Sequence, residues 1–418
     1  MTRHSATLAI DEAVERRRRA GQDVLHLGFG EAGLPPSPGL AEALASAAGR
    51  NGYGPVAGSE EARAAAAGWF ARRGPATGPD QIIYAPGSKP LLFALLAAIG
   101  GDVVLPRPAW VSYAAQAALL GREVIAVPIP PEAGGIPDPM LLDRALREAK
   151  AHGAHPRTLI LTVPDNPTGT VAPAEQVEAV CAMAERHGLA IISDEIYAEL
   201  CHPGAVETAP SATRYLPERT VVTSGLSKSL ALGGWRIGFA RVPAGQWGRE
   251  LYRDLTGIAS EVWSALAAPM QAVATYALDE PPEIRTRIAA SRRLHGRMAA
   301  AVRAEFTAAG AACRPPQAGF YLYPDFAALA PKLDAQGIRT GADLATVLLD
   351  RHGVATLPGS AFGDPGSALT LRVATSLLYG TTAEQRTAAL AAQEPETLPW
   401  IAAALARLRV ALGGLSGF

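Results

Sequence analysis

Lysine is scarce in this sequence, and one lysine lies where an amine could do chemistry. Only four lysines are present, so arginine supplies almost all of the positive charge. Lys228 lies in residues 225–238, with Leu226 before it, Leu230 after it and Arg236 eight positions on. Apolar surroundings disfavour the charged ammonium, so they lower the pKa of a lysine and prepare it as a nucleophile or base. We therefore predict a reactive amine at Lys228 rather than a solvated surface charge.

Polar side chains follow two of the expected strands. Asp194 comes directly after the apolar run 189–193, and Asn166 lies in the tight turn 165–169 that follows the run 158–163. Open α/β sheets place their ligands at the carboxyl ends of parallel strands. A buried carboxylate at this edge would bind a cation strongly, because a low dielectric strengthens the attraction. The turn at 165–169, taken alone, is more typical of an ordinary connection than of a ligand site.

Two glycine-containing segments could approach a phosphate group. Residues 87–90 precede the apolar helix expected over 91–99, with Ser88 as its predicted N-cap, and a helix N-terminus attracts anions. Gly-x-Gly-x-x-Gly spacing occurs at 28–33, but the prolines that follow do not suit the start of a regular helix. We predict a candidate phosphate site at 87–90 and a loop, not a dinucleotide site, at 28–39.

The elements that must position these side chains alternate along the chain. Short β-branched runs alternate with longer Ala- and Leu-rich helical patterns, which predicts an α/β fold. The expected form is a large domain with a mostly parallel, mixed sheet covered by helices. The expected strands are residues 102–105, 123–127, 158–163, 189–193, 220–223 and 236–241, and the helices between them include 109–121, 140–151 and 174–187.

The pattern changes in the last third of the chain. From about residue 285 a long Arg-rich helix is followed by strand patterns at 320–323 and 369–374 and by a helix at 399–412. This predicts a smaller α+β domain formed by the N- and C-terminal segments. The expected division is an N-terminal arm at 1–45 that joins the small domain, a large domain at 46–284 and a small C-terminal domain at 285–418.

The composition excludes several classes of protein. The 418 residues carry 38 Lys and Arg against 39 Asp and Glu, so there is no basic excess and no nucleic-acid partner is expected. The apolar run 91–100 is too short to cross a bilayer, and no membrane partner is expected. Three scattered cysteines predict neither a disulfide framework nor a metal site. With no visible signal peptide, we expect a cytoplasmic protein.

Taken together, these segments resemble the class I/II aminotransferases, the fold-type I enzymes that use pyridoxal phosphate. The match follows the family's order over nearly the whole chain, and residues 225–238 fit the attachment-site pattern at every constrained position. The supporting motifs are Tyr53-Gly-Pro-Val-Ala-Gly58-Ser-Glu, Pro108-Ala-Trp110-Val-Ser-Tyr113, Asn166-Pro-Thr-Gly169 and Asp194-Glu-Ile-Tyr197. The resemblance implies pyridoxal 5'-phosphate as the cofactor, bound by the large domain.

The resemblance assigns the chemistry of the cofactor ring to five residues. Lys228 would form a Schiff base with the cofactor aldehyde and carry the proton between substrate and cofactor. Asp194 would pair with the pyridine nitrogen and keep it protonated, which makes the ring a better electron sink. Tyr197 and Asn166 would hydrogen-bond the phenolic oxygen. Trp110 would stack on the ring face.

The resemblance also implies how the phosphate is bound. Backbone N–H groups and one charged partner would bind it, at Gly87, Ser88, Lys89, Ser227 and Arg236. Tyr53 would reach the phosphate of the neighbouring subunit, which implies a homodimer with shared sites. The family often has a serine three positions before the lysine. Here that residue is Gly225, so Ser227, Ser224 or a backbone group would compensate.

Substrate binding is assigned to three residues. Gly30 would lie in the loop that closes over the substrate, and Asn166 would also contact it. The family's usual spacing places Thr370 at the position of the arginine that clamps the α-carboxylate. Arg372 lies two residues later and would face the same side of a strand, so we assign the clamp to Arg372.

These assignments predict a pyridoxal-phosphate-dependent aminotransferase that moves an amino group from an amino acid to a 2-oxo acid. A lyase, a replacement enzyme or an oxidase would use the same cofactor residues, so these reactions stay open as alternatives. A non-catalytic cofactor-binding protein is a further alternative, which the complete set of site residues disfavours. No second arginine can be assigned to a distal carboxylate, so no specificity for aspartate is predicted.

Overall fold

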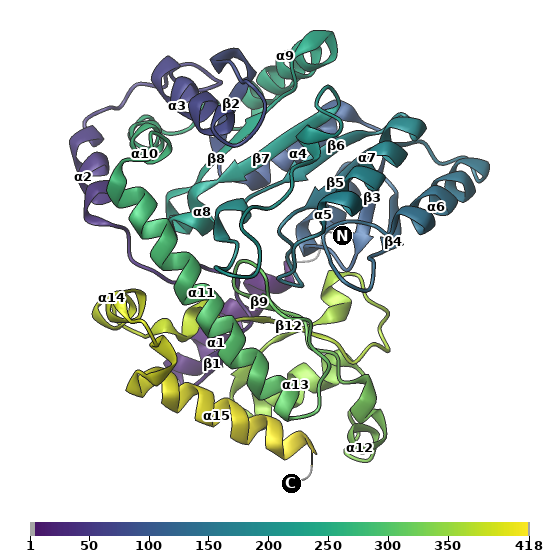
Figure 1. Ribbon diagram of the computed structural model, residues 1–418, viewed down its shortest axis with the longest axis vertical. Coiled ribbons are helices and arrows are strands. Elements are labelled where there is room, and N and C mark those ends of the chain that lie inside the picture. Colours follow the sequence, from purple (N-terminus) through teal and green to yellow (C-terminus); the bar gives the residue numbers. More distant parts are fainter. Residues whose placement is uncertain (1–4, 417–418) are drawn as a thin grey trace.

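A seven-stranded sheet forms the centre of the molecule in this computed structural model, which describes residues 5–416. Its order is β2-β8-β7-β6-β5-β3-β4 (Figure 1). From β7 to β4 all neighbours run parallel, whereas β8 runs antiparallel to β2 and β7. The predicted α/β fold with a mostly parallel, mixed sheet is confirmed. The strands are β2 (Ile82–Pro86), β3 (Asp102–Arg107), β4 (Val124–Pro128), β5 (Pro156–Thr162), β6 (Ala190–Asp194), β7 (Thr220–Gly225) and β8 (Ile237–Arg241).

Side chains of the sheet alternate between two cores, one on each face. Ile160 and Ile192 belong to the first core, whereas their neighbours Leu159 and Ile191 belong to the second. Burial on both faces explains why these strands are continuous apolar runs. The first face is covered by α4 (Ser88–Ile99), α5 (Val111–Leu119) and α9 (Gly245–Val262), and the second by α3 (Glu60–Ala71), α6 (Pro139–Ala151), α7 (Ala174–His187) and α10 (Ala268–Leu278).

A second group of elements lies below the large sheet in Figure 1. Its strands are β9 (Tyr321–Leu322), β11 (Leu357–Pro358) and β12 (Leu371–Ala374), which form an antiparallel sheet, and β1 (Leu25–His26) and β10 (Val354–Ala355), which pair in parallel. Its helices are α1 (Ala6–Arg19), α11 (Pro282–Ala308), α12 (Ala330–Asp334), α13 (Gly341–His352), α14 (Ala383–Ala391) and α15 (Pro399–Ser416). The β1–β10 pair joins the N-terminal segment to the C-terminal part of the chain.

Two local predictions were wrong for the same reason, which is the backbone geometry of a helix start. Ser88 is not the N-cap but the first residue of α4, and Gly87 precedes it with a φ of 94° that favours glycine. The segment 28–39 is not a loop throughout, because α2 (Pro38–Ala47) begins at Pro38. Proline suits the first helical position, where its missing N–H has no partner to lose.

None of the helices within residues 5–416 combines the length and apolarity needed to span a membrane.

Candidate active site

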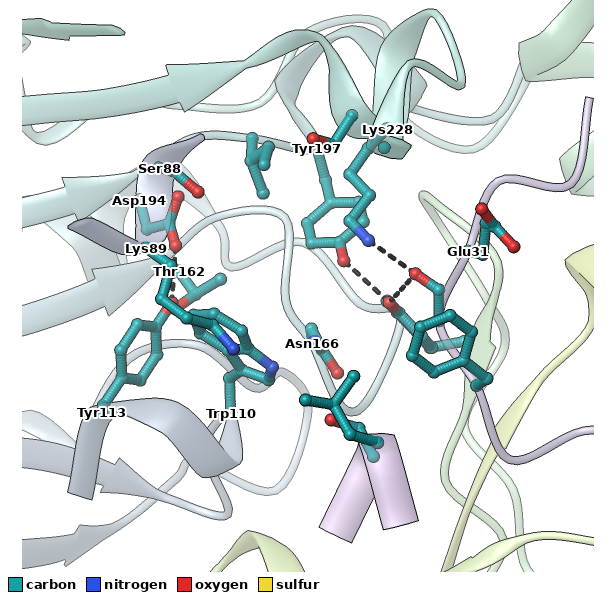
Figure 2. A pocket seen from close by; sticks show the side chains of 18 of the residues that line it. Glu31, Ser88, Lys89, Trp110, Tyr113, Thr162, Asn166, Asp194, Tyr197 and Lys228 are labelled. Atoms are coloured by element: carbon teal, nitrogen blue, oxygen red, sulfur yellow. Dashed lines mark hydrogen bonds between the residues drawn. The ribbon is translucent and has the colours of Figure 1, made fainter. Parts of the chain in front are cut away.

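A cavity lies at the carboxyl ends of β5, β6 and β7. Its volume is ≈ 480 Å³, and we call it the lysine pocket. Most of the side chains singled out from the sequence line it (Figure 2). The predicted residues found there are Gly30, Ser88, Lys89, Trp110, Asn166, Asp194, Tyr197, Ser227, Lys228, Arg236 and Arg372.

Two predicted residues do not line the lysine pocket. The side chain of Tyr53 is 84% exposed and lies away from it. Gly87 lies beneath it, where a Cβ atom would come within 2.2 Å of Nη2 of Arg236. This close approach, together with the positive φ, explains why glycine precedes α4.

Lys228 lies on the short helix α8 (Leu226–Ser229), directly after β7. Its Nζ donates a hydrogen bond to the carbonyl oxygen of Gly30 at 2.5 Å. Burial lowers the pKa of Lys228 to about 8, and the positive charge of Arg372 acts in the same direction. At pH 7 roughly a tenth of this lysine is therefore an uncharged amine.

Asp194 is the last residue of β6 and is 2% exposed. Its carboxylate accepts hydrogen bonds from the hydroxyls of Tyr113 at 2.8 Å and Thr223 at 3.2 Å. Burial raises the pKa of Asp194 to about 6, and the two hydroxyl donors oppose that rise. A cation placed beside this carboxylate would stabilise its charged form further.

Asp194 is held by side chains of two other elements, Tyr113 on α5 and Thr223 on β7. Thr162 on β5 and Thr223 on β7 both stand opposite Asp194 in the sheet register. Thr162 also bonds to the hydroxyl of Tyr113, at 2.9 Å. These contacts were not predicted, because they depend on the register between the parallel strands.

Tyr321 on β9 is a residue of the lysine pocket that the sequence analysis missed. Its hydroxyl bonds to the hydroxyl of Tyr197 at 2.8 Å and donates to the carbonyl oxygen of Gly30 at 3.5 Å. A Cβ atom at position 30 would lie 2.1 Å from that hydroxyl, so only glycine fits. The sequence offered a weak signal, an aromatic residue within a strand pattern, but not its proximity to Tyr197.

Arg372, and not Thr370, reaches the lysine pocket. It lies on β12, is 1% exposed, and donates from Nη2 to the carbonyl oxygen of Gly28 at 2.6 Å. Its guanidinium carbon lies 4.9 Å from the ring centre of Tyr321, and its Nε has no hydrogen-bond partner among residues 5–416. Thr370 instead donates to Asp364 at 2.7 Å.

The opposite end of the pocket is formed by the start of α4 and the segment around Arg236. Lys89 lies with its Nζ 5.2 Å from the ring centre of Trp110. Gly225 replaces the family's serine because a Cβ atom there would lie 2.7 Å from the carbonyl oxygen of Ile237. Arg236 remains exposed and donates only locally, to Gly233 at 3.0 Å.

The fold and this pocket define an α/β enzyme that combines a buried amine with a buried carboxylate. The family model for aminotransferase class I and II matches residues 22–391. The chain belongs to this family. The prediction of the family from sequence is confirmed, and so is the prediction of an aminotransferase.

Relatives and solved structures agree with this assignment. The aspartate aminotransferase of Geobacillus stearothermophilus is 33% identical over 91% of this chain and 95% of its own length. The aspartate/prephenate aminotransferase of Thermus thermophilus is 32% identical over 86% of this chain and 89% of its own. The structure of an aspartate aminotransferase from Thermus thermophilus with maleate superposes with a TM-score of 0.80 at 30% identity, covering 93% of this chain and 96% of that chain.

Proposed function

We propose that the lysine pocket binds pyridoxal 5'-phosphate and that Lys228 is its attachment residue. The observation that carries this proposal is a buried amine with a pKa near 8 in the same pocket as the buried carboxylate of Asp194. When bound, this cofactor supplies an electron-withdrawing ring that accepts the electron pair released at the substrate carbon.

The residues of the pocket fit this group. Oδ1 of the buried Asn166 has no partner within the described residues, so its amide is available to a ligand. Asp194 offers a buried negative charge to a ring cation, and the indole of Trp110 offers a flat apolar face. Arg236 and the N-terminus of α4 offer positive charge and free N–H groups to a phosphate. We assign the phosphate site to Gly87, Ser88, Lys89, Ser227 and Arg236.

Different residues of the chain then have different roles in the proposed reaction. Nζ of Lys228 would take the proton from the substrate carbon and deliver it to the cofactor, because its lowered pKa allows both the charged and the neutral form near neutral pH. Tyr113 and Thr223 hold the carboxylate of Asp194 in place. Arg372 binds the substrate α-carboxylate through the guanidinium N–H that lacks a partner. The segment containing Gly30 covers the reacting atoms and excludes water.

We propose an acidic amino acid as the first donor to test. The relatives named above are aspartate and aspartate/prephenate aminotransferases. Besides Lys228, Arg236 and Arg372, the pocket contains the ammonium of Lys89, which could meet a second carboxylate. This goes beyond the sequence analysis, in which only a second arginine was sought.

We also propose that the chain acts as a cytoplasmic homodimer with shared sites. The support is Tyr53, a large aromatic residue that is 84% exposed and remote from its own pocket. The division at 1–45, 46–284 and 285–418 is retained as a proposal. In this division β1 of the N-terminal arm adds to the small domain through its pairing with β10.

The test is to mix the cofactor-loaded enzyme with one amino acid and no acceptor, and to count the 2-oxo acid released. Transamination predicts one equivalent per site and further turnover only after a 2-oxo acid is added. Continuous release of ammonia, pyruvate or peroxide without an acceptor would contradict the proposal. It would assign a lyase, a replacement enzyme or an oxidase instead.

A further inference from the structure

A second cavity shares a wall with the lysine pocket. Its volume is ≈ 380 Å³, which falls within the size range of small-molecule sites. Asp194 lines the lysine pocket, whereas the next residue, Glu195, lines the second cavity. Likewise, Tyr197 lines the lysine pocket and Ala198 lines the second cavity. We call this space the Arg241 cavity, after the residue at the end of β8 that lines it.

Arg241 is a buried cation with an unused donor. It is 3% exposed, and its Nε donates to the hydroxyl of Thr77 at 2.9 Å. Its Nη1 has no hydrogen-bond partner within residues 5–416. A buried guanidinium N–H without an acceptor is costly, so such a group in a cavity wall indicates an absent partner.

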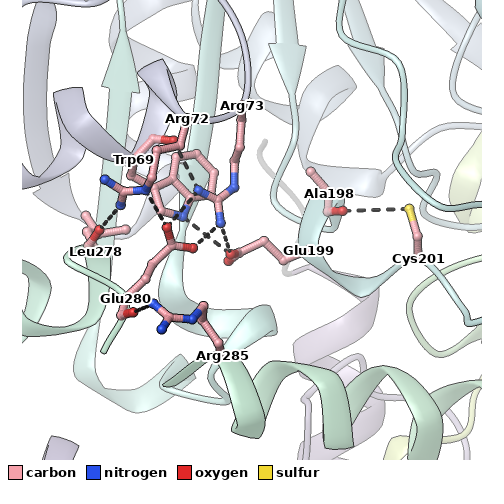
Figure 3. Close-up of polar contacts among 9 residues, drawn as sticks. All are labelled: Trp69, Arg72, Arg73, Ala198, Glu199, Cys201, Leu278, Glu280 and Arg285. Atoms are coloured by element: carbon pink, nitrogen blue, oxygen red, sulfur yellow. Dashed lines mark hydrogen bonds and ion pairs between the residues drawn. The ribbon is translucent and has the colours of Figure 1, made fainter. Parts of the chain in front are cut away.

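The other arginines around the cavity already have hydrogen-bond acceptors. Figure 3 shows Arg73 between Glu199 and Glu280, and Arg72 beside Glu280. Arg73 reaches Glu199 at 2.9 Å, and Arg72 reaches Glu280 at 2.7 Å. Arg292 donates to backbone carbonyl groups. These side chains form the frame of the cavity, and none of these contacts reaches Nη1 of Arg241.

Glu195 does not neutralise Arg241 by direct contact. Its Oε1 accepts hydrogen bonds from Ser193 at 2.8 Å and Ser211 at 2.6 Å. No ion pair within 4.0 Å joins Glu195 to Arg241 in the part of the chain that the structure describes. Burial raises the pKa of Glu195 to about 7, so this carboxyl is partly uncharged near neutral pH.

We propose that the Arg241 cavity is a second ligand site, for a small carboxylic acid whose carboxylate binds the free N–H of Arg241. A carboxylate carries the single negative charge that one guanidinium balances, while a phosphate dianion would meet Glu195 and Glu199 with excess negative charge. Trp69, Phe70 and Ile288 supply an apolar wall for the rest of the molecule. Amino acids and 2-oxo acids share this chemistry. The proposal does not depend on the cofactor assignment.

The first experiment locates the ligand directly. Crystals of the cofactor-loaded enzyme are soaked with L-alanine or, separately, with sodium pyruvate. Density for a carboxylate on Nη1 of Arg241 is expected with at least one of them, and the acid that gives it identifies the source. Density for water alone with both acids would overturn the proposal.

The second experiment measures binding in solution with sodium propionate, which has neither an amino nor an oxo group to react. Calorimetric titration of the wild-type enzyme is compared with Arg241→Gln and with the matched control Arg253→Gln on the exposed side of α9. Arg241→Gln should lose one binding site or weaken it by about tenfold or more, because a charge-assisted bond is removed. Arg253→Gln should bind like the wild type.

Folding of the variant is checked by its thermal unfolding without ligand. Glutamine keeps a polar side chain at this position, so Arg241→Gln is expected to keep a cooperative transition. If Arg241→Gln does not fold, the soaked wild-type crystals alone decide the matter. Unchanged propionate binding by a folded Arg241→Gln protein would overturn the proposal.

Discussion

The lysine pocket and the contact between α11 and α15 use the same kinds of charged side chain in opposite ways. Between the two helices, Glu305 accepts two hydrogen bonds from Arg409, at 2.9 and 2.7 Å, and each charge has its counterpart. In the lysine pocket, Asn166 and Arg372 keep polar atoms without partners in the described part of the chain, and the pKa of Lys228 is lowered. Satisfied charges join elements together, whereas unsatisfied ones mark the place where a ligand binds.

Replacing the amine of Lys228 should have the largest effect on activity. We expect Lys228→Ala to reduce transaminase activity by about a thousandfold or more, because the nucleophile and proton carrier is removed. The measurement is kcat with a single donor and acceptor pair, together with covalent trapping of cofactor by borohydride. Lys150→Ala, at an exposed lysine on α6, is the control. Covalent trapping that survives in Lys228→Ala would contradict the attachment assignment.

Removing the buried carboxylate should have the next largest effect. Asp194→Ala leaves Tyr113 and Thr223 without their acceptor and leaves a ring cation without its counter-charge. We expect kcat to fall by roughly a hundredfold and the cofactor to dissociate more readily. Dialysis followed by cofactor absorbance measures retention. Asp254→Ala, at an exposed position on α9, should change neither quantity, and full activity in Asp194→Ala would remove the proposed role.

Changing the carboxylate clamp should act on the substrate rather than on the cofactor. We expect Arg372→Gln to raise KM for the amino acid by about ten- to a hundredfold, because a charge-assisted pair is lost. Cofactor retention should stay near that of the wild type. The control is Thr370→Val, since Thr370 bonds to Asp364 outside the pocket. An unchanged KM in Arg372→Gln would point to another anchor.

The titration of Lys228 should make the rate of cofactor uptake depend on pH, which is a smaller effect than those of the substitutions above. Its amine must be neutral to attack an aldehyde, and its pKa in the unliganded protein is about 8. The rate of cofactor uptake by the unliganded protein should therefore rise about tenfold per pH unit below pH 8 and level off above it. Stopped-flow absorbance measures this rate. A rate that falls as pH rises would contradict the assignment.

The smallest effect on activity is expected at the ion pair between Glu305 and Arg409. Glu305→Gln keeps the shape of the side chain but removes the negative charge opposite Arg409. The pair is partly exposed, so Tm should fall by only about 1–3 °C, with kcat within about twofold of the wild type. Differential scanning calorimetry and steady-state kinetics test both statements. A large loss of activity would show that α11 and α15 communicate with the pocket.

Six of the seven strands of the large sheet were predicted because their signal is local, whereas β2 was not predicted. A strand buried on both faces must be apolar along its whole length, and β5 and β6 therefore stand out as continuous runs. The short strand β1 could not be predicted, since Leu25–His26 is a strand only through its pairing with β10. Its two residues carry no periodicity of their own.

The residues of the candidate site also differ in whether the sequence alone could identify them. Lys228 and Asp194 could be identified because each lies within a distinctive segment or at the end of a strand. Tyr321 and Thr223 could not, because their roles depend on which side chains the register brings together. Arg241 is the extreme case, since at the end of a strand it resembles any surface arginine until its burial is known.

The scarcity of lysine has a consequence for the selectivity of covalent labelling. Two of the four lysines, Lys89 and Lys228, line the lysine pocket, and Lys150 donates to the carbonyl oxygen of His187. Aldehydes condense with amines and leave the guanidinium groups of this arginine-rich surface largely untouched. The chain therefore offers few competing amines to an aldehyde reagent, which favours single-site modification and slow glycation of the surface.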